Sequence, residues 1–485
     1  MSVKKQLYST TSIIHLDTPL ALTRHMIPQI QELFAAKWFQ TAREYFTNPP
    51  EINIIAINTK DIKLLDILGE LREYLSSSDN VVLPLSQDNP SIANNDKYLS
   101  KIRGILDNIN PKNITRIQRR ALRKYIEINP LGREILKGFY SKIIEDGKIV
   151  QEMELIFNPY TSLVNLAEIH AQCTEYSLVR YSVPELGIQQ ATIHLYYPAE
   201  KRNEYLAQQK IGLTWLPDAL SRICFFNRLL GTKKQPRAIH LFLANFRKEF
   251  MHVSGKSDLV FTPSEINTGV CNMTDIIITR SEESLKTLLH ELIHFHELDF
   301  KHAVHDELCS GLFNITTEQS SFNLFEAHTE CIASILHCLT RTVGESQAKQ
   351  QTDKEFITIF QRLLIAQIYY TMCKSAQILS TSGCYSYDEF ITPSDRQKCQ
   401  LRENTNVFSY FFVKSFIYLS LKEWLISCCD QGTARFIDTH DGQETLKQII
   451  QSGYENKIPM KIINTEILKN HTKTADKSLK MMVVL

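Results

Sequence analysis

One short run constrains this chain more than any other: His290 and His294, with Glu291 directly after the first histidine. The run 284–296 contains no proline or glycine, and its leucines and isoleucine predict a buried helix. Side chains four residues apart lie on one face of a helix, so both imidazoles can reach one Zn²⁺ at about 2.0–2.1 Å. Glu291 would stand beside that ion, where a carboxylate can deprotonate a water molecule. The run therefore predicts a helix that carries a zinc site.

A catalytic zinc needs a third protein ligand and an open position for water. The pattern HExxHxxGxxH is excluded, because Glu297 and Phe300 occupy the positions of its glycine and third histidine. Three nearby histidines remain possible ligands, although no glycine turns the chain back toward the metal. They are His296, His302 and His305.

A better source of the third ligand is a second predicted helix that begins near Asn323. Glu326 and Glu330 are four residues apart on it and share one face. Such a pair suits one ligand and one partner that orients a ligating histidine through its other ring nitrogen. We favour Glu326 as the ligand and Glu330 as its support, with Glu330 as ligand the alternative. His328 points elsewhere on this helix and is interpreted as ordinary.

The chain of 485 residues suggests two or three domains. We divide it into a mainly helical region of unknown role at 1–165, a mixed core at 166–345 and a helical subdomain at 346–485. In the core, β-branched and aromatic runs predict strands, and a helix separates the first two. The expected strands are 191–197, 238–243, 259–262, 267–272 and 275–279, and the expected helices are 216–231 and 282–298.

Outside the core, hydrophobic residues at helical spacing predict further helices. They are expected at 27–46, 62–75, 354–379, 407–429 and 442–454, with a loop at 380–406. A basic cluster is interpreted as a solvated helix face, because the formal net charge is only +1 and no aromatic residues alternate with it. It comprises Lys112, Arg116, Arg119, Arg120, Arg123 and Lys124. We therefore expect no nucleic-acid partner.

The sequence predicts an intracellular protein, in the cytoplasm or nucleus, that is not secreted. The basic N-terminus is not followed by an apolar segment of a secretory signal. The stretch 407–429 is mostly hydrophobic, but it contains too many polar and charged side chains to span a bilayer. No membrane partner is therefore expected. The 11 cysteines form no CxxC pair and are expected to be reduced, mostly buried thiols.

The motif His290-Glu291-x-x-His294, followed by Glu326 and Glu330, resembles that of the gluzincins, the thermolysin-like zinc metallopeptidases. The resemblance implies an α+β fold with a zincin-like core: a twisted mixed sheet, an active-site helix and a glutamate helix, here between helical flanks. It also implies hydrolysis of peptide bonds in a protein or peptide substrate, with Zn²⁺ on His290, His294 and Glu326 and with Glu291 as general base.

A narrower set of runs resembles metallopeptidases encoded by nucleocytoplasmic large DNA viruses. The runs are 262–270, 277–291, 298–300 and 326–330. This resemblance implies a processing protease or virion component in an infected host cell. If the protein is a zinc peptidase, the segment 267–272 is expected to be a sheet edge that pairs with an extended substrate, with Asn267 and Gly269 as ordinary turn residues the alternative.

Two other functions remain open at this point. One is a catalytically inactive, structural zinc-binding scaffold or virion protein, against which the intact Glu291 argues. The other is hydrolysis of a non-peptide carbonyl by the same zinc chemistry. Peptide hydrolysis also calls for a donor to the developing oxyanion. The tyrosines considered for it are Tyr369, Tyr370, Tyr385 and Tyr387.

Overall fold

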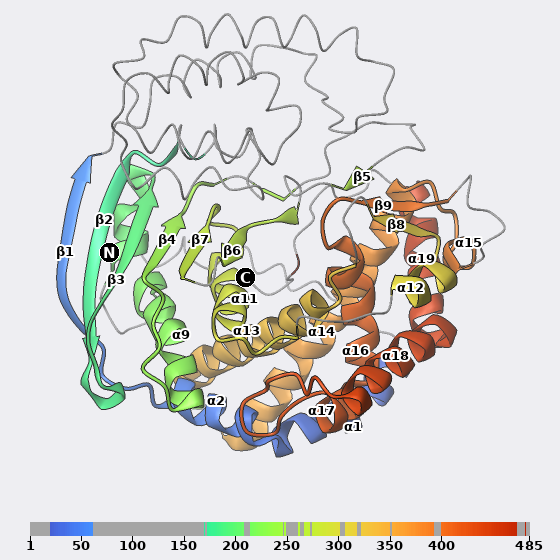
Figure 1. The fold of residues 1–485 in the computed structure, drawn as a ribbon, viewed down its shortest axis with the longest axis horizontal. Helices are drawn as coiled ribbons and strands as arrows, with labels where there is room; N and C mark the ends of the chain where they lie inside the picture. Colours follow the sequence, from blue (N-terminus) through green and yellow to red (C-terminus); the bar gives the residue numbers. More distant parts are fainter. Residues whose placement is uncertain are drawn as a thin grey trace, which may run out of the picture.

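A computed structural model gives the architecture of the chain, which is mixed α+β (Figure 1). It describes residues 20–61, 169, 172–207, 214–245, 247–248, 260–261, 266–271, 274–300, 306–317, 322–349, 352–391, 399–472 and 481. The expected α+β class is therefore confirmed at this level.

A six-stranded mixed sheet forms one side of the molecule, with the strand order β1-β2-β3-β4-β7-β6. The pairs β3–β4 and β4–β7 are parallel, and the remaining pairs are antiparallel. Its strands are β1 (Asn53–Asp61), β2 (Glu175–Val183), β3 (Ile188–Tyr197), β4 (Ala238–Phe242), β6 (Gly269–Cys271) and β7 (Asp275–Ile278). Among the described strands, the short β6 thus lies at one edge of the sheet and runs antiparallel to its neighbour β7.

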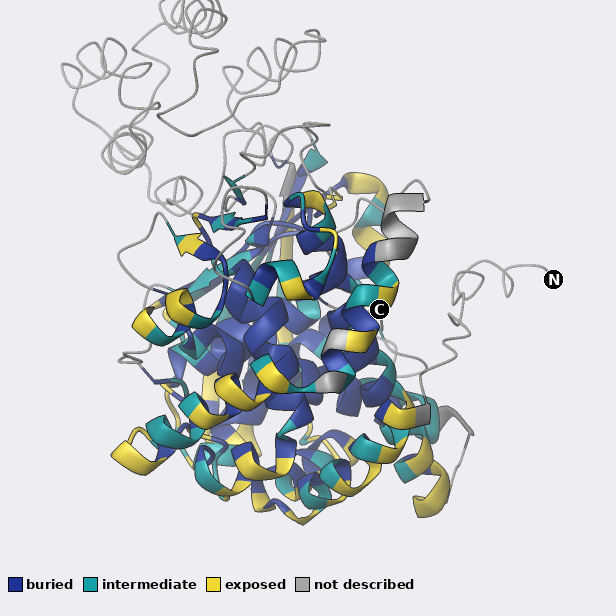
Figure 2. Ribbon diagram, turned by 90° about the vertical axis from the view of Figure 1, so that its right-hand side faces the viewer, coloured by how far each residue is buried: buried dark blue, intermediate teal, exposed yellow. Residues whose placement is uncertain are grey.

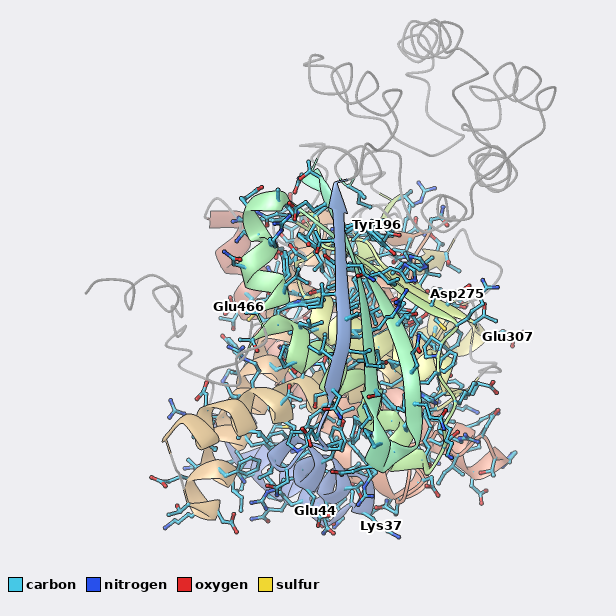
Figure 3. All side chains as sticks on the ribbon, turned by 90° about the vertical axis from the view of Figure 1, so that its left-hand side faces the viewer. Lys37, Glu44, Tyr196, Asp275, Glu307 and Glu466 are labelled. Carbon is cyan, nitrogen blue, oxygen red and sulfur yellow. A yellow bond between two sulfur atoms is a disulfide. The ribbon has the colours of Figure 1, made fainter. Side chains whose placement is uncertain are left out.

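The sheet presents one apolar face to the helices. Alternate residues of β3, namely Ile193, Leu195 and Tyr197, are fully buried in the main core. Helices α9 (Trp215–Leu230) and α11 (Ser284–Phe295) contact each other, and α11 packs on β6 and β7. Tyr196 belongs to the opposite face, where its ring stacks on Phe242 (Figure 3). The predicted Gly231 ends α9 in the left-handed conformation, with φ 59°.

The second layer is helical, and α13 (Phe325–Lys349) is its central element. It contacts α11, α2 and α14 (Asp353–Thr381). Buried residues concentrate in this interior, whereas exposed residues lie on the outer helices (Figure 2). The other helices of five or more residues are α1 (Leu20–Ala35), α2 (Lys37–Thr47), α8 (Arg202–Leu206), α12 (Asp306–Leu312), α15 (Tyr387–Ile391), the π-helix Phe408–Val413, α16 (Lys414–Leu419), α17 (Leu421–Ser427), α18 (His440–Glu455) and α19 (Lys457–Thr472).

A small parallel sheet lies beside this helical layer, in the order β5-β9-β8. Its strands are β5 (Val260–Phe261), β8 (Ile315–Thr317) and β9 (Leu401–Glu403). The π-helix follows β9 directly along the chain, so the pairing of β9 in this sheet positions the start of the C-terminal helices.

The strands and helices expected between 190 and 345 are observed, with ends shifted by a few residues. Strands β1 and β2 were not expected, and β1 lies in the region predicted to be mainly helical. Helices α1 and α2 replace one expected helix, because Ala36 is extended at ψ 125°. The expected helix 407–429 is divided at Ser420, where ψ is 38°. The expected loop 380–406 contains α15 and β9.

The expectation of fully reduced cysteines is wrong at one place, because Cys384 and Cys399 form a disulfide. The expected helix 62–75 and the basic cluster 112–124 lie outside the described residues. Buried residues from Leu22 to Met481 form one hydrophobic core cluster, so the described parts of all three predicted regions pack together.

Helix α14 is the one helix in the described part of the chain that is long and apolar enough to cross a membrane. Half of its most apolar stretch is buried inside the protein, as in an ordinary core helix.

Candidate metal centre

Helix α11 carries both predicted histidines on one face, as the sequence indicates. Leu288, Leu289 and Leu292 of the same helix are buried in the core and fix the helix against the sheet. The Nε2 atoms of His290 and His294 are 3.0 Å apart, and the two rings are nearly perpendicular at 75°. Both rings therefore direct the same nitrogen toward one point.

Helix α13 brings Glu326 to that point. Its Oε2 atom lies 3.1 Å from Nε2 of His290 and 3.4 Å from Nε2 of His294. The three separations of 3.0, 3.1 and 3.4 Å are close to the roughly 3.3 Å between tetrahedral ligands that lie about 2.0–2.1 Å from one zinc ion. The set His290, His294 and Glu326 could hold a metal ion.

No protein-family model, curated protein or solved structure matches this chain. The geometry of the described residues therefore carries the functional argument.

Glu330 occupies a different place from Glu326, although the two are one turn apart on α13. Its Oε2 atom lies 3.1 Å from Nδ1 of His290, on the side of the ring that faces away from Glu326. Lys286 and Lys414 also contact this carboxylate, at 2.6 and 3.2 Å. Of the two alternatives left open by the sequence, the geometry favours Glu326 as the ligand and Glu330 as the residue that orients His290.

His294 has a matching partner that the sequence analysis missed. Its Nδ1 atom lies 2.8 Å from Oδ2 of Asp299, just beyond the end of α11. The chain turns there because Glu297 adopts a left-handed conformation with φ 55°. Nothing in the spacing of Asp299 indicates this contact. A carboxylate thus accepts a hydrogen bond from Nδ1 of each histidine, which leaves each Nε2 lone pair to face the centre.

The charged groups of the centre shift the pKa values of its three donor residues. Burial alone would raise the pKa of Glu326, but the two histidines outweigh burial and hold it well below the usual range. Burial lowers the pKa of His294, but Glu326 and Asp299 outweigh it and the net pKa is well above the ordinary value. For His290 the net direction is also upward, because Glu326 and Glu330 outweigh burial. Without a cation, protons would reside among these groups.

Glu291 lies next to the two histidines and close to the edge strand β6. It is buried, and burial is the main cause that raises its pKa, while the histidines act in the opposite direction. A Cβ atom placed on Gly269 would lie 2.5 Å from Oε1 and 2.9 Å from Cγ of Glu291. The backbone of β6 therefore runs directly over the Glu291 carboxylate, and only a glycine leaves room for it.

Tyr410 of the π-helix is the second residue that the sequence analysis missed. Its hydroxyl donates a hydrogen bond of 3.2 Å to Oε2 of Glu326, and its ring lies 5.9 Å from that of His290. A π-helix widens one turn, and such turns often occur at functional sites. Nothing in the sequence singles out Tyr410, because it lies in a mostly apolar run that looks like any core helix.

The four tyrosines considered from the sequence have other environments. Tyr369 donates to Glu466, Tyr370 lies near Lys374, Tyr385 is 66% exposed and Tyr387 is buried in the core. None of these contacts involves the histidine pair.

Of the three alternative histidine ligands, the structure describes only one. His296 stacks on Phe226 and is absent from the cluster of donor atoms. His302 and His305 lie outside the described residues. His328 is fully buried against the rings of Phe300 and Trp424, which agrees with its interpretation as an ordinary residue.

Proposed function

We propose that this protein is a zinc-dependent metallopeptidase of the gluzincin type. The observation that carries the proposal is the convergence of Nε2 of His290, Nε2 of His294 and Oε2 of Glu326, with Glu291 adjacent. Two imidazoles and one carboxylate form the His₂Glu set of catalytic zinc sites, which leaves a fourth position for water or substrate. Zn²⁺ bound there would act as a Lewis acid toward a carbonyl and make bound water more acidic.

Glu291 is the proposed general base and proton carrier. Its carboxylate follows the first ligand in the helix and is buried against β6. Because burial raises its pKa, it is a better proton acceptor than an exposed glutamate and can later protonate the leaving amine. A residue with this role must not itself be a ligand, and Glu291 does not belong to the donor cluster.

The edge strand β6 is the proposed binding site for an extended peptide. It pairs with β7 on one side, and its three residues are only partly buried. A strand at the edge of a sheet can add a peptide strand through main-chain hydrogen bonds. Gly269 would bring this peptide close to the Glu291 carboxylate.

Tyr410 is the proposed donor to the oxyanion. Its hydroxyl already lies within hydrogen-bond distance of the ligand Glu326, so a small shift would direct it toward a carbonyl oxygen at the centre. Burial, followed by the Glu326 charge, raises its pKa well above the usual range, so it stays protonated and able to donate.

The arrangement of elements supports a zincin-like core, although no match identifies a family. The mixed sheet, the helix α11 and the helix α13 follow one another in the chain order that the gluzincin resemblance implies. We therefore propose that these elements form a zincin-like core. The viral resemblance stays an expectation about the origin of the protein.

The first experiment measures zinc and hydrolysis in the same samples. Purified full-length protein should contain about one zinc per chain, and the double variant His290→Ala/His294→Ala should contain none. The variant Glu291→Gln should keep its zinc and lose cleavage of a fluorescence-quenched peptide library. Normal turnover by Glu291→Gln would refute the mechanism. Full zinc occupancy without cleavage by the wild type would favour the structural zinc protein instead.

A further inference from the structure

Behind His290 lies a fully buried carboxylate between two buried ammonium groups. Oε2 of Glu330 accepts from Lys286 at 2.6 Å, and Oε1 of Glu330 accepts from Lys414 at 3.2 Å. The side chains of all three are at most 2% exposed. We call Lys286, Glu330 and Lys414 the lysine clamp.

Two lysines on one carboxylate are more than charge neutrality requires. Lysine is rarely buried completely, because removal of an ammonium group from water costs several kcal/mol. The three residues of the clamp come from three different helices, α11, α13 and α16. Such a costly arrangement at a single carboxylate calls for a role beyond ordinary packing.

The remaining contacts show what the clamp holds in place. Oε2 of Glu330 also faces Nδ1 of His290 at 3.1 Å, and Oε1 lies 3.5 Å from the Ser334 hydroxyl. Each carboxylate oxygen therefore has two neighbours that can donate a hydrogen bond. An ionised carboxylate is only an acceptor, so the proton in the contact with His290 belongs to Nδ1 of the imidazole. The lone pair on Nε2 is then directed at the metal centre.

We propose that Lys286 and Lys414 are positioning residues of the metal centre, which act on His290 through Glu330. The inference rests on the proposed metal-binding function. By fixing both oxygens of Glu330, the lysines fix the ring orientation and the tautomer of His290, and so raise the affinity of the centre for a divalent cation. The clamp is also sealed from solvent, since Met481 places its sulfur 3.5 Å from Nζ of Lys286.

The test measures zinc affinity of the full-length protein by competition with a chromophoric chelator. Lys286→Met and Lys414→Met remove one ammonium group each and keep an unbranched side chain. Loss of a contact that orients a metal ligand typically weakens metal binding by about 10–100-fold, and we expect losses in this range. Unchanged affinity in both variants would overturn the proposal.

A double-mutant cycle separates an indirect effect from a direct one. If the lysines act through Glu330, Lys286→Met should weaken zinc binding by less than about 2-fold when added to Glu330→Gln. If Lys286→Met weakens zinc binding as much in the Glu330→Gln background as in the wild type, the lysine acts by another route and the proposal fails. If Lys286→Met alone does not fold, the step from Glu330→Gln to Glu330→Gln/Lys286→Met still measures what this lysine does when Glu330 is not charged, and a loss of zinc affinity above about 10-fold in that step would overturn the proposal.

Lys248 supplies a matched control. It is equally buried and forms its salt bridge with Glu283 at 3.1 Å; in the described structure it makes no hydrogen bond or ion pair with Glu330, whose charge acts on it only from a distance. Lys248→Met should lower the melting temperature of the zinc-free protein and leave zinc affinity unchanged, whereas an equal loss of affinity would refute the specific role of the clamp. Absence of zinc from the wild type would overturn the proposed function. Zinc in the wild type with unchanged affinity in both clamp variants would overturn this inference alone.

Discussion

Gly269 offers the sharpest test of how β6 and helix α11 fit together. An added Cβ atom would lie 2.5 Å from Oε1 and 2.9 Å from Cγ of Glu291, and 2.8 Å from Cγ2 of Thr287. Gly269 is absent from the residues with positive φ, so alanine meets no backbone strain there. The variant Gly269→Ala therefore tests the close approach alone.

The expected loss of activity follows from how far the added methyl group overlaps its neighbours. Carbon atoms in ordinary contact are about 3.5–4.0 Å apart, so the methyl group intrudes by roughly 1 Å. The Oε1 atom is the end of a flexible chain, but Cγ of Glu291 and Cγ2 of Thr287 are held by a buried helix and cannot turn away. A displacement of about 1 Å at a catalytic group costs about 100-fold in rate, or about 2.7 kcal/mol in the activation free energy.

The assay compares kcat for a cleaved peptide with the zinc content of the same preparation. We expect Gly269→Ala to lose about 100-fold in kcat and to keep its zinc, because its nearest neighbours are Glu291 and Thr287 and not metal ligands. The matched control is Gly311→Ala in α12, where a Cβ atom meets nothing within 4 Å. A kcat within 3-fold of wild type (roughly 0.7 kcal/mol) for Gly269→Ala would refute the reasoning.

Three further predictions concern single side chains. Asp299→Asn weakens the hydrogen bond to Nδ1 of His294, so zinc affinity should fall about 10-fold in chelator competition, and unchanged affinity would contradict the role of this contact. Tyr410→Phe should lower kcat about 100-fold with full zinc content, and loss of zinc instead would assign the tyrosine to metal binding. Burial lowers the pKa of His328 to about 4, whereas an unfolded histidine titrates near 6.5. The unfolded chain then binds a proton that the folded chain excludes, so stability falls as pH drops below about 6.5. In urea unfolding, His328→Leu should remove about 2 kcal/mol of the stability lost between pH 6.5 and pH 5, and an unchanged pH dependence would count against it.

The sequence predicted the local parts of the site because their information is local. The spacing of His290, Glu291 and His294 sets their directions once a helix forms, and the apolar residues between them ensure that it is buried. The spacing of Glu326 and Glu330 also pointed to the two glutamates that the structure places against His290. It did not decide between them, because the rotation of α13 about its axis depends on packing against α11, α14 and α16.

The missed residues reach the site through tertiary structure alone. Tyr410 lies in a run of buried aromatic and aliphatic residues, and Asp299 lies in a turn whose direction depends on the φ of Glu297. Neither residue repeats a helical or strand period that would separate it from its neighbours. Contacts between distant segments leave no such period in a single sequence.

The misassigned elements have a similar cause. The break at Ala36 has no glycine or proline, and its backbone is extended where α1 ends and α2 begins. β1 forms by pairing with β2, more than a hundred residues later, and only the sheet makes it favourable. The Cys384–Cys399 disulfide likewise joins residues on either side of α15, and pairings of this kind cannot be deduced from cysteine spacing.

The charges around the two histidines suit a cation at the centre. Glu326, Glu330 and Asp299 each contact a histidine, and Glu291 stands beside them. The clamp lysines offset two of these four carboxylates. With neutral histidines, an excess of two negative charges would remain in a buried site, where uncompensated charge is costly.

Two kinds of positive charge can compensate this excess. Without a metal, protons do so, since Glu326 and its neighbouring carboxylates raise the pKa of His294 well above its ordinary value despite burial. A divalent cation supplies the same charge at the point where both Nε2 atoms and the Glu326 oxygen meet. Metal binding must then displace protons, and its free energy contributes to folding because the donors come from separate helices. With the two clamp lysines in place, the charge left to compensate around the histidines equals that of one divalent cation.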